Sequence, residues 1–341
     1  MVLSLQRLII HELEKEAEAT EATVFLAEEV QPRDEKAQQL VDRLNGAFTG
    51  KMDVLQGYLS SPEDALFPGY FQEWLDSGLS EAGFVDFSKN TMNALQLALQ
   101  GVVGAKGGYL AYAEYRYFDT HYLGIFLVRN TEGIVFQKPE EATRFLLETI
   151  TYLNIDKLAL ACRIQIDAFQ QGENRCVELI KHAKSQKSIS DYFVNWIGLD
   201  QAESSKKLTS AFLEVVNHLP LPVDEDSGQP ITEGEFREKV MNFALESPRQ
   251  TIEVEQFDKT FYGNQQPTKE YMEENEIELD QNFRFDENTL RKFYNGRVYA
   301  DGIALSFNRS HLQRHQIEIE GDSIIIRSEA LVEKLMQMME E

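Results

Sequence analysis

His311 and His315 are the residues whose spacing most directly suggests metal chemistry, because side chains four apart share one face of a helix. A zinc protease of the His-Glu-x-x-His type places its general base directly after the first histidine. Here Leu-Gln-Arg separates the two histidines, so that base is missing, and the charge of Arg314 would oppose a dication. The pattern therefore predicts a solvated surface pair and no bound metal.

Other catalytic patterns are also missing from the sequence. The two cysteines, Cys162 and Cys176, offer too few ligands for a metal site and are expected to be reduced, half-buried thiols. The carboxylates come in dense runs such as EYMEENEIELD, whereas general acid–base catalysis uses isolated, partly buried carboxyl groups. No G-x-S-x-G elbow is present. We therefore predict no catalytic residue, no cofactor and no enzyme activity.

The glycine-rich segment GVVGAKGG, residues 101–108, has the composition of a phosphate-binding loop. Such a loop needs a strand before it, a helix after it, and Lys-Ser or Lys-Thr at its end. Here a predicted helix precedes the segment and a predicted strand follows it. The segment therefore indicates a flexible turn and no nucleotide site.

Charge is unevenly distributed along the 341 residues, whose formal net charge is −24. Residues 1–86 hold 17 acidic and 6 basic residues, and residues 224–280 hold 16 acidic and 5 basic, so each segment carries −11. Two segments have a basic excess: residues 175–198, with four bases against two acids, and residues 281–316, with six against three. This balance argues against indiscriminate coating of nucleic acid and leaves room for a localised contact surface.

The candidate nucleic-acid-binding residues are the cations of these two basic segments, since lysine and arginine close to a phosphate backbone release condensed counterions. The first set is Arg175, Lys181, Lys184 and Lys187, and the second set is Arg284, Arg291, Lys292, Arg297, Arg309 and Arg314. The competing interpretation of the first set is an ordinary solvated helix face over a core.

The first set is expected on a helix that follows a strand. Apolar residues alternate from Leu158 to Ile166, so this stretch predicts a strand that packs on one side and turns Arg163 to the other. Residues 175–186 are expected to form a helix with its lysines in water, followed by a short helix that ends at Gly198. Three short helices in a row also allow a helix-turn-helix variant, although the connection between the last two lacks a distinctive turn.

A tyrosine-rich hairpin is expected at residues 108–130, around the turn at Asp119 and Thr120. A base-stacking platform would need exposed rings beside several cations, and only Arg116 and Arg129 are near. The tyrosines therefore indicate cross-strand packing within a sheet.

The whole pattern favours an α+β fold of two domains, with mixed or antiparallel sheets and flanking helices. We expect further strands at 2–13, 22–30 and within 282–327, and helices at 32–48, 51–59, 62–77, 84–99, 200–218, 236–246 and 328–339. The predicted domains are residues 1–150, a central strand plus helices with a basic face at 151–220, and, after a proline-rich linker at 219–230, residues 231–341. No segment approaches the roughly 18 apolar residues of a membrane span, and no signal peptide is recognisable, so we expect a cytosolic protein.

Three segments, in this order, resemble the bacterial nucleoid-associated protein family of the NdpA/YejK type. They are GGYLAYAEYRYFDTHYLGIFLVRN (107–130), the stretch from YLNIDKLALACRIQIDAF to ENRCVELIKHAKSQKSISDYFVNWIG (152–198), and GIALSFNRSHLQRHQIEIEGDSIIIR (302–327). Together they span most of residues 107–330, while residues 1–100 match in length and general pattern. The resemblance implies a cytoplasmic, nucleoid-located protein that binds DNA, with RNA as a further ligand, and no known enzyme chemistry.

Three hypotheses follow for the function. The first is a nucleoid-associated protein that binds DNA or RNA with low sequence specificity through local basic surfaces. The second is an acidic adaptor that docks on basic DNA-handling proteins, so that its association with DNA is indirect. The third is a nuclease or an accessory component of a phage-defence system, which rests on the abundance of acidic residues alone. A homodimer is one of the oligomeric states that the sequence leaves open, and no membrane partner is expected.

Overall fold

The structure is a computed structural model that describes residues 3–51, 54–102, 104–138, 144–155, 158–172, 175–180, 187–224, 228–275, 277, 279–300, 302–308, 311–312 and 314–339. It divides into two compact units, residues 1–205 and residues 206–341. Helices and antiparallel strand pairs occur in both units, so the predicted α+β class is confirmed. The domain boundaries expected from the sequence remain predictions.

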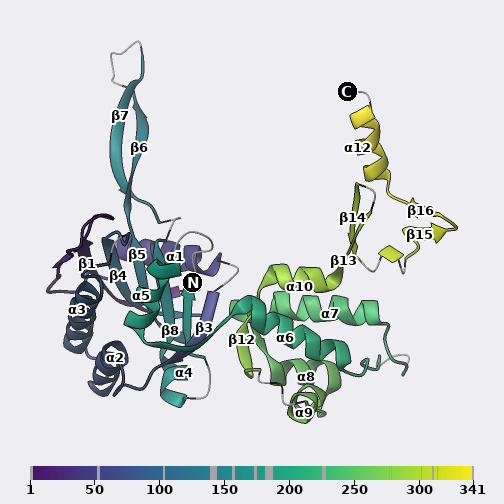
Figure 1. Ribbon diagram of the computed structural model, residues 1–341, viewed down its shortest axis with the longest axis horizontal. Coiled ribbons are helices and arrows are strands. Elements are labelled where there is room, and N and C mark those ends of the chain that lie inside the picture. The colour runs from purple at the N-terminus through teal and green to yellow at the C-terminus, as the bar shows by residue number, and fades with distance from the viewer. Residues whose placement is uncertain are drawn as a thin grey trace. The chain divides into compact units, whose positions relative to one another are not determined.

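The first unit is built on one sheet, in which the described residues form eight strands with antiparallel pairing throughout (Figure 1). The strand order is β10-β3-β9-β8-β5-β4-β1-β2. The strands are β1 (Leu3–Glu14), β2 (Thr23–Phe25), β3 (Val54–Leu59), β4 (Gly108–Tyr117), β5 (Thr120–Val128), β8 (Leu160–Gln165), β9 (Val177–Ile180) and β10 (Leu199–Ser204).

Helices cover both faces of this sheet. The helices of the unit are α1 (Glu35–Thr49), α2 (Leu66–Asp76), α3 (Glu81–Ala98), α4 (Ile166–Gln171) and α5 (Lys187–Ile197). One core joins a sheet face to aromatic residues of α2, α3 and α5, including Trp74 and Trp196. The other core joins the opposite face to α1, through residues such as Phe48. The central strands are therefore buried on both sides, and the tyrosines Tyr112, Tyr115 and Tyr122 are core residues, as predicted.

A two-stranded ribbon, β6 (Asn130–Gln137) and β7 (Leu146–Leu153), lies between β5 and β8 in the chain. Figure 1 shows this ribbon projecting beyond the strands of the sheet. The ribbon forms a separate two-stranded sheet, because its strands pair with each other and with no other described strand.

The second unit is mainly helical around its own core, which includes Phe212, Phe257 and Leu290. Its helices are α6 (Ser205–His218), α7 (Glu233–Glu246), the 3-10 helix η1 (Pro248–Gln250), α8 (Val254–Tyr262), α9 (Pro267–Glu274), α10 (Glu287–Tyr294) and α12 (Glu329–Met339). Its strands pair as β11 (Thr251–Glu253) with β12 (Asn282–Arg284), β13 (Asn295–Ala300) with β14 (Ile303–Asn308), and β15 (Ile317–Glu320) with β16 (Ser323–Ile326).

Three predicted helices differ from the structure. Residues 54–59 form the strand β3, and residues 177–180 form the strand β9, where a helix over 175–186 was expected. The helix expected at 200–218 begins at Ser205, after β10. The run Val-Glu-Leu-Ile of β9 is buried throughout and pairs with β3 and β8, and such a short apolar run does not distinguish a strand from a buried helix by period alone.

Both cysteines are free, which agrees with the expected reduced thiols, but both are buried where half-buried side chains were expected. Cys162 lies in the central strand β8, and Cys176 immediately precedes β9. Burial raises the pKa of the Cys176 thiol to about 11 and raises that of Cys162 still further. Within the described residues, no helix is long and apolar enough to cross a membrane.

Candidate nucleic-acid interface

In the first predicted set of cations, Arg175 is held by the protein itself. Its guanidinium donates to the carbonyl oxygens of Gln56 (3.1 Å) and Gln201, and it lies over the Tyr58 ring with 5.4 Å to the ring centroid. Arg175, two residues before β9, thus contacts β3 and the edge strand β10, and part of its guanidinium is engaged by these contacts. Lys181 and Lys184 lie outside the described residues, and Lys187 opens α5 with a side chain that is also outside them.

In the second set, Arg284 lies inside the second unit. It is 1% exposed on β12, and its Nη2 donates to Oε1 of Gln250 at 3.1 Å. A buried guanidinium cannot reach a phosphate unless the unit opens. Arg284 therefore does not belong to a solvent-facing surface, although charge alone places it with its neighbours.

Two cations of the second set, Arg291 and Lys292, lie together and exposed in the last turn of α10, here called the α10 cationic turn. The helix is fixed by Asp286, whose side chain accepts from the amide of Thr289, and by the buried Leu290. The two cations therefore follow one after the other on a rigid element.

The electrostatic surroundings of the two cations differ. Arg291 is half exposed and pairs with Glu287 one turn earlier, which offsets part of its charge. No ion pair joins Lys292 to any side chain that the structure describes. Lys292 is thus the member of the α10 cationic turn with most charge left for an external anion.

Arg237 of α7 supports the end of α10, a role that the sequence did not reveal. Its guanidinium lies over the Phe293 ring, 4.5 Å from the centroid, and donates to the Phe293 carbonyl oxygen at 3.2 Å. It also pairs with Glu233 on its own helix at 2.6 Å. Because the C-terminal carbonyl groups of a helix are partly negative, this donation reduces their repulsion of an anion at the α10 cationic turn. A Glu-x-x-x-Arg spacing is common, so sequence could not indicate it.

The remaining members of the second set are placed less completely. Arg297 stands on β13, just after α10, with its backbone opposite Ser306 of β14, and its side chain is outside the description. Arg314 is exposed in a turn, while Arg309 is not among the described residues. The structure therefore brings Arg291, Lys292 and the backbone of Arg297 into one contiguous segment.

The predicted histidine pair is not a helical pair. His315 has a positive φ of 54° and lies 3.3 Å from Glu318, so its backbone has left the helical region. In the part of the chain that the structure describes, no group of three or more His, Cys, Asp or Glu side chains is positioned to hold a metal ion.

Arg163 is a cation that the sequence placed on the unpacked face of a strand and that the structure places in the core. It is 1% exposed, and its Nε donates to Glu178 at 2.9 Å across the β8–β9 pair. It also donates to Asn45 of α1 and lies 4.6 Å from the centroid of the Phe48 ring. Burial alone would lower the pKa of Arg163, but the Glu178 carboxylate more than offsets burial and raises it. Arg163 is thus a structural residue.

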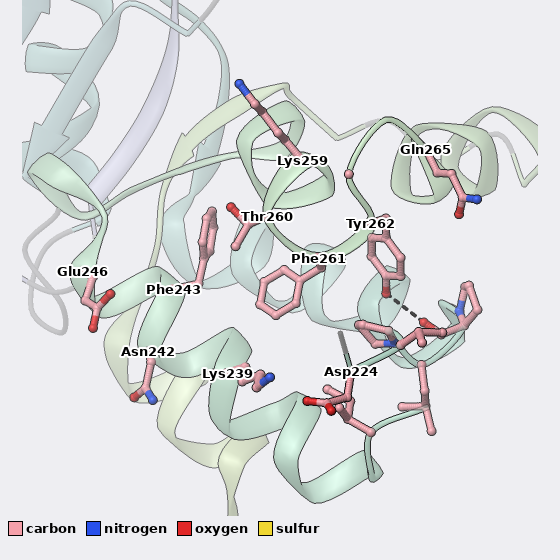
Figure 2. A pocket seen from close by; sticks show the side chains of 16 residues that line it. Asp224, Lys239, Asn242, Phe243, Glu246, Lys259, Thr260, Phe261, Tyr262 and Gln265 are labelled. Carbon is pink, nitrogen blue, oxygen red and sulfur yellow. Dashed lines mark hydrogen bonds between the residues drawn. The ribbon is translucent and has the colours of Figure 1, made fainter. Parts of the chain in front are cut away.

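A groove of about 990 Å³ in the second unit lies between α7, α8 and the segment 220–224 (Figure 2). Tyr262 donates its hydroxyl to the carbonyl oxygen of Pro220 at 2.9 Å, the hydrogen bond that is dashed beside Tyr262 in Figure 2. Lys239 and Lys259 line the groove together with Asp224 and Glu246, so its formal charge is balanced. A balanced groove gives a phosphate backbone little attraction, and the groove is not part of the candidate interface.

Comparison with known proteins identifies the family. The model of the family described as nucleoid-associated protein YejK matches residues 9–334. The chain belongs to this family. It is 24% identical over 333 residues to a nucleoid-associated protein of Pseudomonas fluorescens (strain Pf0-1), with 94% of each chain covered. It is 25% identical over 339 residues to one of Pseudomonas aeruginosa (strain UCBPP-PA14), covering 96% of this chain and 95% of the relative.

The YejK family match extends over both compact units. The matched residues include the β6–β7 ribbon, the α10 cationic turn and all of the eight-stranded sheet except the first residues of β1. Membership supports a nucleoid-associated role for the protein, as the resemblance implied.

Proposed function

We propose that the protein binds DNA with low sequence specificity, and that the α10 cationic turn is part of its contact surface. The observation that carries the proposal is the exposed pair Arg291 and Lys292 on a helix end braced by Arg237, within a family named for association with the nucleoid. Contacts from such side chains go to phosphates, which carry no base information.

The acidic segments help to define how DNA approaches. Residues 224–280 carry a net charge of −11, whereas residues 281–316 carry six bases against three acids. The acidic surface repels a polyanion and the basic segment attracts it, so the protein is oriented during the encounter. Arg297, Arg309 and Arg314 extend the proposed surface beyond α10, and Lys181, Lys184 and Lys187 form a second proposed surface.

Titration of a labelled DNA duplex at several salt concentrations tests this proposal. If the five cations of the second set other than Arg284 contact phosphates, the logarithm of the binding constant should fall against log salt with a slope of roughly −4.5. Replacing Lys292 by alanine should weaken binding to unrelated sequences equally and reduce this slope by about 1.

A matched control distinguishes the loss of a charge at the α10 cationic turn from the loss of the same charge elsewhere. Lys269 is exposed on α9 in the acidic segment, so Lys269→Ala removes the same charge away from the α10 cationic turn. Equal losses for Lys269→Ala and Lys292→Ala would show that total charge matters and the proposed location does not. Absence of binding at low salt would refute direct DNA binding altogether.

RNA binding and the adaptor function are further outcomes of the same experiment. A double-stranded RNA of equal length, titrated in parallel, measures whether the surface prefers one backbone. If purified protein binds neither duplex at low salt, the acidic adaptor becomes the better hypothesis, because association with the nucleoid would then need a protein partner. Metal-dependent cleavage of the labelled duplex would instead favour the enzymatic hypothesis.

A further inference from the structure

The turn between β4 and β5 holds a large apolar ring at a position where such turns normally have glycine. Tyr117 pairs with Thr120, so Phe118 and Asp119 are the two central residues of the turn. Phe118 has a φ of 51°, whereas Asp119 has no positive φ. A two-residue turn with a positive φ at its first central position favours glycine there, because a bulky side chain in this region is strained. Phenylalanine therefore carries a conformational cost at this turn that glycine would avoid.

Packing does not explain the choice of phenylalanine at this position. Phe118 is 49% exposed and is absent from both cores of the first unit as the structure describes them. Its ring meets the edge of the Tyr117 ring, with 4.7 Å between the ring centroids, and about half of its surface stays in water. An exposed ring that is held in a strained turn indicates a role in binding, since strain of this kind gathers at functional sites.

The charges beside the ring permit the approach of a polyanion. Arg116 lies two residues before Phe118, is exposed, and forms no ion pair within the described ranges. Asp119 is the one acidic residue in the sequence from 116 to 120, so Arg116 offsets it. The turn thus combines an exposed ring with an available guanidinium, the combination that the buried tyrosines of the same hairpin lack.

The buried carboxylate behind the turn is compensated by partners of its own. Glu114, two residues before Arg116, forms an ion pair with Arg7 of β1. Its other oxygen lies 2.9 Å from Nε2 of His121 on β5. Glu114 therefore does not compete with an external anion for Arg116.

The glutamates at the end of β1 lie at the opposite end of the sheet. Because β1 and β4 are antiparallel, Leu3 stands opposite Tyr117, whereas Glu12 stands opposite Tyr109. Eight residues of strand separate the two positions on β4, which is about 26 Å. This separation is roughly three Debye lengths at physiological ionic strength, so these carboxylates repel DNA little at the turn.

We propose that Phe118 is a wedge that enters between two adjacent base pairs of a DNA duplex from the minor groove, while Arg116 contacts the backbone beside it. Proteins that kink DNA commonly combine an inserted apolar side chain with neighbouring arginines in this way. The inference rests on the proposed binding of DNA and adds a second contact, on the first unit, that deforms the duplex. Pyrimidine–purine steps unstack most easily, so the wedge favours DNA that contains them, a preference that phosphate contacts do not supply.

Energy transfer between dyes at the two ends of a short duplex tests the wedge, because a kink brings the ends closer together. Saturating full-length protein should raise the transfer efficiency on a duplex with a central TA step, as expected for a kink of roughly 20–90°. Phe118→Gly should bind this duplex about fivefold or more weakly, because the contact between ring and base is lost. At saturation, Phe118→Gly should leave the transfer efficiency at the value of the free duplex.

The two proposals fail in different ways. Wild-type protein that binds the duplex without changing the transfer efficiency would overturn the wedge and leave the proposed DNA binding intact. Absence of any binding at low salt would refute both. Transfer that rises equally with the wild-type protein and with Phe118→Gly would show that the duplex is bent without this ring, and would also overturn the wedge.

Phe25 provides a matched control, since it is a phenylalanine of the same unit and is 65% exposed. It lies on β2, opposite Glu12 of β1 and therefore away from the turn. Phe25→Ala should bind and kink the duplex as the wild-type protein does, and equal losses for Phe25→Ala and Phe118→Gly would contradict the proposed location.

Urea unfolding of Phe118→Gly distinguishes a binding role of the ring from a packing role. Glycine adopts a positive φ without strain, so the unfolding midpoint of the first unit should not fall. A clearly lower midpoint would show that the ring is needed for folding and would overturn the argument from strain.

Discussion

Replacing Glu178 by glutamine would leave the guanidinium of Arg163 in the core without the carboxylate that it contacts. Both side chains are at least 94% buried, and the guanidinium carbon of Arg163 lies 4.6 Å and 4.8 Å from the ring centroids of Phe48 and Tyr122. Breaking a buried ion pair by removing one partner typically costs about 3–5 kcal/mol, because the remaining charge stays desolvated. Glutamine keeps one acceptor oxygen, so we expect the low end of that range, a loss of about 3 kcal/mol in the free energy of unfolding.

Tryptophan fluorescence during urea unfolding measures this loss of stability in the first compact unit, which contains Arg163 and Glu178. The chain has two tryptophans, Trp74 and Trp196, and both are buried in the first unit, so the signal reports on that unit alone. For about 200 residues, a loss of about 3 kcal/mol corresponds to a melting temperature lower by roughly 6–12 °C. The denaturant dependence of the free energy should stay unchanged if the unit still unfolds in one step.

An ion pair at the surface of the same unit provides the control. Glu28 is 77% exposed and pairs with Lys89 at 2.7 Å. Glu28→Gln should cost less than about 1 kcal/mol, since solvent screens exposed pairs. The double variant Arg163→Met, Glu178→Leu should be more stable than Glu178→Gln, because it leaves no buried charge. If Glu178→Gln costs no more than Glu28→Gln, or if the double variant is the less stable of the two, the argument from desolvation is refuted.

Three further predictions concern the same unit and use the same fluorescence measurement. His11 is fully buried, and burial lowers its pKa from 6.5 to about 4. The folded state therefore prefers the neutral ring. The contribution of His11 to the free energy of unfolding should be fully present above pH 6.5 and should decrease by about 3 kcal/mol as the pH falls to 4. His11→Gln should remove this part of the pH dependence, and an unchanged profile would contradict the assignment. Gly57→Ala should destabilise the unit by about 1–3 kcal/mol, because its Cβ would stand 2.5 Å from the carbonyl oxygen of Asp200 on β10. Gly46→Ala meets no atom within 4 Å in α1 and should instead stabilise the unit by about 0.5–1 kcal/mol; a loss there would show that the space around Gly46 is misjudged.

Local patterns in the sequence predicted the elements whose partners are near in the chain. The amphipathic helices α1 and α3, the tyrosine hairpin of β4 and β5, and the presence of strands within residues 282–327 all follow from periodicity and turn residues. In contrast, β3 and β9 pair with each other across more than a hundred residues. Their short runs acquire strand geometry from those partners, so local spacing suggested helices instead.

In the candidate interface, too, local sequence predicted some features, while others depend on distant parts of the chain. A basic excess in residues 281–316 was visible from charge, and Arg291 and Lys292 are indeed exposed. Charge counts could not show that Arg284 is buried or that Arg175 is occupied by the carbonyl oxygens of neighbouring strands. Burial depends on which elements cover a residue, and that information lies in distant parts of the chain.

The two natural cysteines lie at positions where their labelling rates report on opening of the first unit. Cys162 stands in the middle of the sheet, whereas Cys176 lies beside the entry to β9. Cys162 is 0% exposed and Cys176 is 3% exposed, and burial raises the pKa of both thiols, so we expect both to react slowly with an alkylating reagent in the closed state. Modification of Cys162 therefore requires the sheet to separate, while modification of Cys176 requires a smaller opening near β9. The ratio of the Cys176 labelling rate to the Cys162 labelling rate therefore compares local opening near β9 with separation of the whole sheet. Both thiols are natural, so no probe has to be introduced.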